Sequence, residues 1–564
     1  MTASTAPRPA PVAGRFPSWR RPDPWRAGVI TVALLLTLPI ATVFGAIFLP
    51  VGETWHHLVE TVLADYVLNS LGLMLGVAVG VLSIGVTCAW LTANCHYPGR
   101  RLFEWALLLP LAIPAYIIAY TYTGMLDYPG PVQSALRAGF GWGYGDYWFP
   151  EIRSLGGAIA MLSLVLYPYV YLLARAAFLE QSLHALEAGR ILGAGPWARL
   201  TRIALPGARP AIIAGLSLAL METLADYGTV QYFGVATFTT GIFRTWYGLD
   251  DSGAAAQLAA LMMLFVFALI LTERWSRRQA RYHHAGQRSK PLPRLHLAGW
   301  RAALATAACA LPLLLGFVLP VAQLTTWAAR TLEVTVADPF PQLVVNTLAL
   351  AASAALLALL LALFMAYGRR LRGGFAVTAA VRVAALGYAI PGTVIAVGVL
   401  IPFGWLDNTI DGWARARFDF ATGLLLSGTL FALLFTYMVR FLAVSLQTVE
   451  AGLERVKPMM DESARTLGLT PGRVLARVHL PMLRGSLLTA ILLVFVDVMK
   501  ELPATLILRP FNFNTLAVRA YELASDERLA EAAGPAIAIV LAGIVPVILL
   551  SRSIARSRPA KDVH

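Results

Sequence analysis

Long runs of apolar residues recur along the chain and point to a membrane-spanning architecture. A run of about 20 such residues crosses a hydrocarbon core roughly 30 Å thick, and the backbone inside lipid must form helices to satisfy its hydrogen bonds. The chain is 58% hydrophobic and only 13% charged, which is unusual for a soluble domain. We therefore predict an all-α polytopic membrane protein with about twelve spans. They are expected near 28–50, 66–93, 103–124, 155–174, 210–233, 254–272, 302–325, 343–368, 378–403, 422–441, 485–508 and 534–551.

A polar segment occurs twice within this apolar chain. "EAGRILGAGPWARLTRIALP" runs from Glu187 to Pro206, and "ESARTLGLTPGRVLARVHLP" runs from Glu462 to Pro481. The similarity extends to "AIPAYIIA" and "AIPGTVIA", which precede the two copies at a nearly constant spacing. Six crossings return a chain to its starting side, so two such units are parallel repeats related by an axis along the membrane normal.

The repeat divides the chain into two homologous units with polar connections. We expect a disordered cytoplasmic tail, a first six-span repeat, a basic cytoplasmic linker, a second six-span repeat and a cytoplasmic tail. These parts correspond to residues 1–27, 28–272, 273–301, 302–551 and 552–564.

The distribution of basic residues sets the predicted orientation. Most of the 45 Lys and Arg residues fall in the tails and in alternate loops on one side of the predicted spans. The positive-inside rule places that side, with both termini, in the cytoplasm. The net charge of +14 then reflects membrane topology, and we expect no nucleic-acid partner.

Each polar segment is predicted to be a short helix, a turn and a second short helix. Gly193 and Gly468 follow the first helix and suit the left-handed conformation of a helix C-terminus. Pro206 and Pro481 are expected to end the second helix. A loop that merely joins two spans is the alternative, but two copies in the same register weaken it.

The pattern of Glu, Gly six residues later and a closing Leu-Pro resembles the EAA loop of ATP-binding-cassette importer permeases. Gly189 and Ser463 depart from that pattern, and both are small. The resemblance implies an ABC type I importer permease fold, in which this loop docks into a cleft on a cytoplasmic ATPase. The docking residues it implies are Glu187, Gly193, Leu205, Pro206, Glu462, Gly468, Leu480 and Pro481.

The chain is not expected to hydrolyse ATP itself. None of its four lysines, at 290, 457, 500 and 561, follows a glycine, so the G-x-x-x-x-G-K-[ST] phosphate loop is absent. We expect no catalytic residue and no cofactor on this chain, with ATP-Mg bound by a separate ATPase. Two docking segments imply two ATPase copies.

The stretches from Met221 and from Asp497 resemble fused ferric-iron importer permeases. This resemblance implies a bacterial inner-membrane protein that receives Fe³⁺ from a periplasmic binding protein. Permeases for thiamine, polyamines or sulfate share the architecture and remain alternatives. A secondary transporter is a further alternative, although it would not need two docking segments.

Ionisable residues within predicted spans are candidates for the translocation path. Glu222 and Asp226 match Asp497 and Glu501 between the repeats. Asp226 and Glu501 are candidate transient metal ligands, since hard cations prefer oxygen. The alternative is that these acids pair with Lys500 or with other spans and hold helices together. The matched Arg244 and Arg519 fall in outer loops and are candidates for gating or binding-protein contact.

Overall fold

The computed structural model confirms an all-α membrane architecture. It describes residues 23–180, 193, 195–279, 294–333 and 339–556. Within these ranges, eleven helices are long and apolar enough to cross a membrane. The number becomes twelve if Arg100–Ala112 and Ala115–Phe140, which are bent by 91°, form one span. A short parallel bridge joins β1 (Cys95–His96) to β2 (Leu295–His296).

The first repeat consists of helices of very different lengths. In chain order they are α1 (Pro24–Gly45), η1 (Ala46–Phe48), α2 (Glu53–Thr61), α3 (Leu63–Asn94), α4 (Arg100–Ala106), η2 (Leu109–Ala112), α5 (Ala115–Leu126), α6 (Pro131–Phe140), α7 (Leu155–Glu180), α9 (Pro196–Arg199), η3 (Leu200–Ala204), α10 (Leu205–Ala225), α11 (Gly228–Tyr232), α12 (Phe238–Phe243), η4 (Arg244–Gly248) and α13 (Ser252–Gln279).

The second repeat follows the same plan. Its helices are α14 (Trp300–Leu313), η5 (Leu314–Val318), α15 (Leu319–Arg330), α17 (Phe340–Arg372), α18 (Phe375–Ala384), η6 (Ala385–Ala389), α19 (Gly392–Phe418), α20 (Leu430–Leu453), α21 (Pro458–Thr466), α22 (Pro471–Val474), η7 (Leu475–His479), α23 (Leu480–Met499), α24 (Pro503–Leu508), α25 (Leu516–Ser525) and α26 (Leu529–Arg556). Thus α3, α7 and α10 correspond to α17, α20 and α23.

Four of the expected spans are interrupted at matched places. The span expected at 103–124 breaks before Pro114, and the one expected at 378–403 breaks before Pro391. Proline lacks the N–H that a continuing helix needs and restricts the residue before it. The spans expected at 210–233 and 485–508 also stop, where α10 ends at Ala225 and α23 ends at Met499. An apolar run gives no sign of such breaks, because the residues on both sides are equally apolar.

Some expected boundaries differ from those of the helices. α19 continues to Phe418, and the chain then returns as a loop, so α20 begins at Leu430 and not near 422. α13 extends to Gln279, which lies inside the expected linker 273–301. α26 likewise extends into the expected C-terminal tail. Most of the two tails and residues 280–293 of the linker lie outside the described residues.

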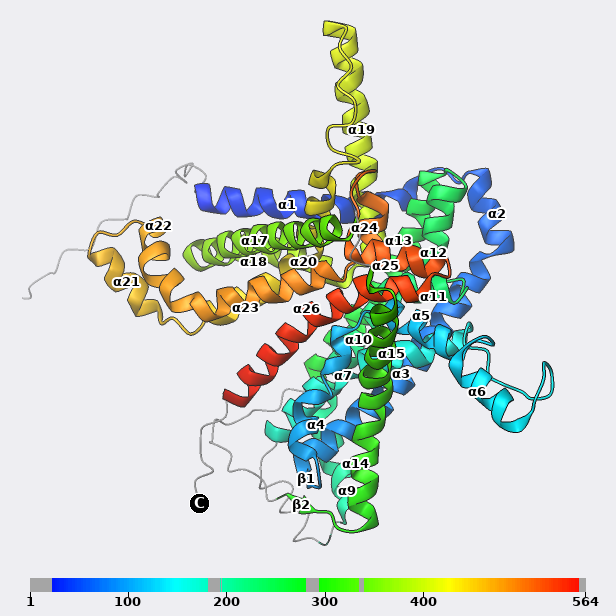
Figure 1. The fold of residues 1–564 in the computed structure, drawn as a ribbon. Coiled ribbons are helices and arrows are strands. Elements are labelled where there is room, and N and C mark those ends of the chain that lie inside the picture. The colour runs from blue at the N-terminus through cyan, green and yellow to red at the C-terminus, as the bar shows by residue number, and fades with distance from the viewer. Residues whose placement is uncertain (1–22, 181–192, 194, 280–293, 334–338, 557–564) are drawn as a thin grey trace, which may run out of the picture.

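Helices of each repeat pack against helices of the other repeat. Figure 1 shows two arms that diverge from a common junction near α5, α11 and α24. One arm contains α17, α18, α20 and α23, and α1 of the first repeat packs against it. The other contains α3, α4, α7 and α10, against which α14 and η5 of the second repeat pack. Each hydrophobic core therefore contains residues of both repeats. The sequence repeats are not separate structural domains.

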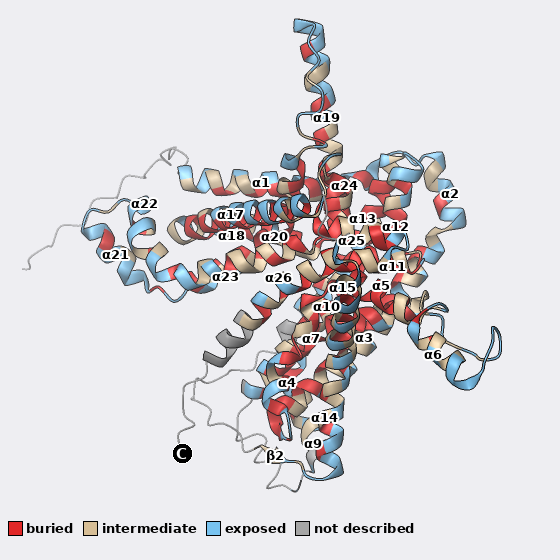
Figure 2. Cartoon of the chain, viewed as in Figure 1, coloured by how far each residue is buried: buried red, intermediate tan, exposed pale blue. Residues whose placement is uncertain are grey.

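Burial follows this arrangement. Figure 2 shows buried residues concentrated at the junction and where the helices within each arm pack together. The outer sides of α1, α3 and α17 carry exposed apolar side chains, such as Leu34, Leu75 and Leu360. Exposed apolar stripes on long helices are what a surface in contact with lipid requires.

Small residues allow α3 and α7 to pack closely. A Cβ on Gly76 would lie 2.4 Å from Ile159 Cδ1, and one on Gly80 would lie 2.1 Å from Ser163 Oγ. In the second repeat, α17 packs on α20 with buried alanines that include Ala351, Ala354 and Ala358. Small residues at such contacts let helix backbones approach in membranes.

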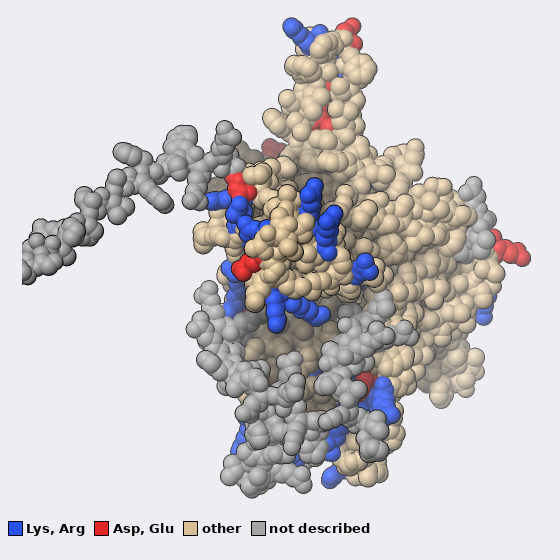
Figure 3. Space-filling model, turned by 90° about the vertical axis from the view of Figure 1, so that its left-hand side faces the viewer, with Lys and Arg blue, Asp and Glu red and all other residues tan. Residues whose placement is uncertain are grey.

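A hollow separates the free ends of the two arms. Figure 3 looks onto these ends and shows a recess between them, with Lys and Arg side chains gathered on its rim. Exposed rim residues on α21 to α23 include Arg465, Arg473, Arg477 and Arg484. α21 and α22 lie at the end of one arm and α9 lies at the end of the other. α2, α6 and the far end of α19 project on the opposite side of the junction.

Candidate functional site: a charged cavity between the repeats

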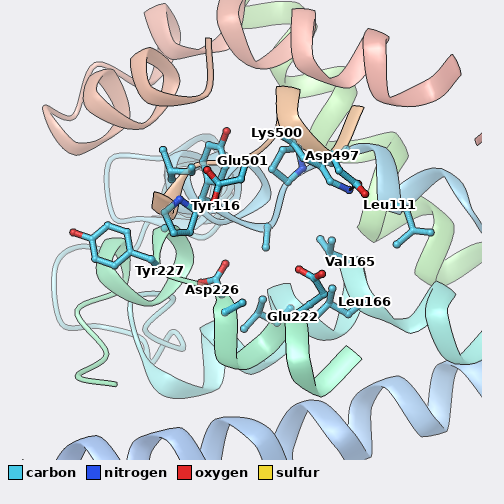
Figure 4. A pocket seen from close by; sticks show the side chains of 18 of the residues that line it. Leu111, Tyr116, Val165, Leu166, Glu222, Asp226, Tyr227, Asp497, Lys500 and Glu501 are labelled. Carbon is cyan, nitrogen blue, oxygen red and sulfur yellow. Dashed lines mark ion pairs between the residues drawn. The ribbon is translucent and has the colours of Figure 1, made fainter. Parts of the chain in front are cut away.

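A cavity of about 120 Å³ lies between the two repeats. It is lined by the matched breaks described above, so residues from η2, α5, α10 and α11 face residues from η6, α23 and α24. α7 and α20 complete the wall. Figure 4 shows Glu222 and Asp226 on one side of the cavity, with Asp497, Lys500 and Glu501 on the other. All four acids predicted for the path therefore line one cavity.

Asp226 and Glu501 both cap the short helix that follows each break. Asp226 Oδ1 accepts hydrogen bonds from the backbone N–H groups of Thr229 and Val230, at 3.0 and 3.1 Å. Glu501 accepts equivalent bonds from Ala504 and Thr505, both at 3.0 Å. A carboxylate at a helix N-terminus satisfies N–H groups that have no helical partner. The capping role explains why both repeats need an acid here, and a metal-binding role stays a prediction.

The other matched pair is Glu222 and Asp497. Among the described ion pairs, Asp497 has one partner and Glu222 has none. Lys500 Nζ lies 2.9 Å from Asp497 Oδ1. A second cation, Arg440, places Nη1 3.3 Å from Glu501 Oε1. Both cations come from the second repeat, so the cavity wall holds four carboxylates against two basic groups. The lining therefore has an excess of negative charge.

Three tyrosines add phenol groups to this wall. Tyr169 of α7 and Tyr388 of η6, one from each repeat, both line the cavity. The hydroxyl of Tyr116 is buried and has no hydrogen-bond partner. Sequence reasoning missed all three tyrosines, because tyrosine is common in apolar spans and these positions do not match between the repeats. Arg440 was also missed, although an arginine near an apolar run is a recognisable signal.

The cavity is not a preformed metal centre. Among the described residues, no group of three or more His, Cys, Asp or Glu side chains is arranged to hold a metal ion. The carboxylates are spread around the wall, and two of them are occupied as helix caps. In this conformation the cavity suits brief contact with a passing ion better than tight retention.

The second docking segment has the predicted helix-turn-helix shape. α21 is followed by Gly468 with φ of +80°, and α22 then begins at Pro471. Gly193 of the first segment has the same φ of +80°. The prediction that both glycines adopt the left-handed conformation is confirmed. Glu462 lies on α21, whereas Glu187 lies outside the described residues.

The expected helix end at the closing prolines is wrong. Leu205 and Pro206 begin α10, and Leu480 and Pro481 begin α23. In each case a five-residue π-helical turn, η3 or η7, leads directly into the long helix. Each proline therefore lies inside a continuous helix, at the point where the π-helical turn interrupts the regular α-helical hydrogen bonds that proline cannot complete.

A polar network fixes the second docking segment to its arm. Arg370 at the end of α17 binds Asp461 of α21, with 2.7 Å between Nε and Oδ2. Its two remaining nitrogens donate to the carbonyls of Leu453 and Val456. Asp461 Oδ1 lies 2.7 Å from Nε2 of the fully buried His479. The start of α21, the end of η7 and the end of α17 are thereby held as one body.

Arg244 and Arg519 lie at matched places away from the cavity. Arg244 begins η4, is exposed, and hydrogen bonds to Tyr66. Arg519 lies on α25, with Nη1 3.8 Å from Glu522 Oε2. Their role in gating or in binding-protein contact stays a prediction.

One known protein resembles the chain over nearly its full length, and others resemble a part of it. Fe(3+)-transport system permease protein FbpB 2 of Haemophilus influenzae is 25% identical over 544 residues, which cover 94% of this chain and 99% of that protein. Molybdenum transport system permease protein ModB of Escherichia coli is 28% identical over 207 residues, 36% of this chain and 87% of that protein. A probable sulfate transport system permease protein, cysT of Chlorokybus atmophyticus, is 25% identical over 259 residues, 44% of this chain and 86% of that protein.

One protein family matches the chain at two places. The family described as binding-protein-dependent transport system inner membrane component matches residues 82–281 and again 358–562. The two matches fall in the two structural repeats and together cover more than half of the chain. The chain therefore belongs to the binding-protein-dependent transport system inner membrane component family, as a fused, two-half permease of an ABC importer.

Proposed function

We propose that this permease imports ferric iron, and the charge of the cavity is the observation that carries this proposal. Four carboxylates and two basic groups line the wall. A molybdate or sulfate ion would be repelled by such an excess of carboxylates, whereas a hard cation would be attracted. Carboxylate and phenol oxygens are suitable partners for Fe³⁺. The similarity to an Fe(3+) permease over 94% of the chain supports the same substrate.

Similarity over the full length separates iron from the organic alternatives. Thiamine and polyamines are also cations, so charge alone does not separate them from iron. The relative that covers 94% of this chain is an Fe(3+) permease. Molybdate and sulfate are the alternatives that other relatives support, and both are disfavoured by the charge.

The energy for transport comes from two copies of a separate ATPase in this proposal. The docking segments lie at the free ends of the two arms, where closure of an ATPase dimer would move the arms together. The basic rim of the hollow favours a cytoplasmic location for this side. Both termini are then cytoplasmic, the protein lies in the bacterial inner membrane, and an iron-binding protein docks on the opposite, periplasmic side.

Reconstitution tests this function directly. The permease, its ATPase and its binding protein are placed in lipid vesicles, and ATP-dependent uptake is measured with radioactive iron, molybdate and sulfate in parallel. We expect saturable uptake of iron and no uptake of either anion. Uptake of molybdate or sulfate without iron would refute the iron assignment, and uptake without ATP or the ATPase would favour a secondary transporter.

A further inference from the structure

The ion pair of Lys500 and Asp497 lies in the cavity but has no role in the proposed import of iron as described above. Lys500 follows the last turn of α23, three residues after Asp497, and its Nζ lies 2.9 Å from Asp497 Oδ1. The two side chains are 29% and 23% exposed, against 11% and 2% for Arg440 and Glu501. The lysine pair therefore faces the open space of the cavity, whereas the arginine pair belongs to the wall.

The arginine pair is fixed by its surroundings. Glu501 also accepts bonds from the backbone of Ala504 and Thr505. A Cβ on Gly392 would lie 2.2 Å from Arg440 Nη1 and 2.8 Å from Glu501 Oε1. No space exists there for the pair to separate. Lys500 is different, because one flexible stem and one ion pair hold its ammonium group in place.

The groups around Lys500 form an incomplete set of oxygen ligands. Glu222 occupies the position in the first repeat that Asp497 occupies in the second, and Figure 4 shows the two on opposite sides of the cavity. The phenols of Tyr169 and Tyr388 line the same wall. The buried hydroxyl of Tyr116, which has no partner, lines it as well. The position that matches Lys500 in the first repeat is Ala225, so this cation occurs on one side only.

We propose that Lys500 is a resident counter-ion, which neutralises Asp497 in the empty cavity and is displaced when a multivalent cation arrives. Asp497 and Glu222, with the phenols of Tyr169 and Tyr388, then become oxygen ligands of the passing ion. This inference rests on the proposed transport of a hard cation and assigns the residue that regulates access to the path.

Coulombic competition makes the exchange selective. At equal distance a trivalent cation attracts a carboxylate three times as strongly as an ammonium group does. A monovalent ion has no such advantage over a lysine that is already in place. Displacement moves one proton-bearing ammonium group toward the water of the hollow, and no bond or proton is transferred. After the ion leaves, Lys500 returns to Asp497 and restores the neutral pair.

Binding of Tb³⁺ to the permease–ATPase complex in lipid nanodiscs tests the proposal. Tb³⁺ is a hard trivalent cation whose luminescence rises when a nearby tyrosine transfers energy to it. Lys500→Met removes the competing charge at nearly the same side-chain size. We expect tyrosine-sensitised Tb³⁺ binding to become roughly tenfold tighter or more, because a unit charge a few ångströms away is lost. Lys500→Arg keeps the positive charge on a guanidinium group, which can hold Asp497 with two hydrogen bonds. This variant should bind Tb³⁺ more weakly than the wild type.

Two further variants make the outcome decisive. Arg417→Met removes one positive charge from the exposed end of α19 and should leave Tb³⁺ affinity unchanged. Glu222→Gln combined with Asp497→Asn should abolish the sensitised signal. Equal affinities in the wild type, Lys500→Met and Arg417→Met proteins would overturn the proposal. If iron is still imported in that case, only the role of Lys500 fails. If no iron is imported by the wild type, the proposed function itself fails.

Discussion

The two repeats share a backbone plan but hold their charges differently at the cavity. Asp226 and Glu501 cap the short helix after each break, and their matched positions give both halves the same geometry. The basic residues Lys500 and Arg440 have no such counterpart, since Ala225 and Val165 occupy the matched positions. The second repeat neutralises its own carboxylates, whereas the first repeat leaves Glu222 without a basic partner among the described ion pairs.

The docking segments differ in the same way. Asp461 and His479 belong to a polar network in the second segment. The matched residues of the first segment are Leu186 and Ala204, whose side chains cannot form such bonds. Backbone geometry is thus repeated where prolines, glycines and caps set it, while the polar contacts of Asp461 and His479 have no equivalent side chains at the matched positions.

The largest effect is expected from the buried arginine of the second repeat. Arg440→Met leaves the carboxylate of Glu501, which is 2% exposed, without its cation. Loss of one partner of a buried pair typically costs about 3–5 kcal/mol. Thermal unfolding of the purified complex should show this loss. The matched change Val165→Met adds apolar volume without removing a charge partner and should cost less, about 1–3 kcal/mol.

A double variant distinguishes the lost pair from poor packing. Glu501→Gln added to Arg440→Met removes the unpaired charge and should recover part of the stability. A double variant as unstable as Arg440→Met alone would mean that the pair is not the source of the difference between the repeats.

A smaller effect is expected when the second docking segment is made to resemble the first. Asp461→Leu leaves Arg370 and His479 without their shared partner, and a hydrogen bond to a charged group contributes about 1.5–3 kcal/mol. Co-purification of the ATPase and its coupled transport should both decrease. Adding His479→Ala should restore part of the coupling, because the buried imidazole that lost its partner is then gone, whereas Arg370 is kept since it also donates to the carbonyls of Leu453 and Val456. Full coupling in Asp461→Leu would show that the network does not position the segment.

The smallest difference between the repeats is expected at the docking glycines. Both have φ of +80°, a region that costs an ordinary side chain about 1–2 kcal/mol. Gly193→Val and Gly468→Val should therefore weaken ATPase docking to a similar extent, with each single change already reducing transport. The variants should still insert into the membrane. A Gly468→Val protein that transports normally, beside an impaired Gly193→Val protein, would show that only one segment is needed.

The repeated architecture was predictable because its signals are local and occur twice. Gly193 and Gly468 lie in equivalent positions of two similar segments, and their conformation follows from the helix end that they terminate. The apolar runs predicted the all-α membrane fold for the same reason. The positions of Glu222 and Asp497 in matched spans also predicted that they share one cavity.

The features that could not be predicted from the sequence depend on contacts between residues far apart in the chain. Hydropathy cannot show that α1 packs on the second repeat, since the helix is equally apolar wherever it packs. It also cannot show that the spans of Asp226 and Glu501 break at these residues, because a carboxylate that caps a helix looks like any ionisable residue in an apolar run. Tyr169 and Tyr388 lie at unmatched positions, so the repeat gave no indication that both line the cavity.

Uptake by a variant without the two opposed carboxylates tests the cation path most directly. Glu222→Gln and Asp497→Asn keep side-chain size and leave the caps and docking segments unchanged. In vesicles with the ATPase and the binding protein, this double variant should lose most of its iron uptake, while the ATPase remains bound. Iron uptake equal to that of the wild type would contradict the account, because the cavity between the repeats would then not be the path of the cation.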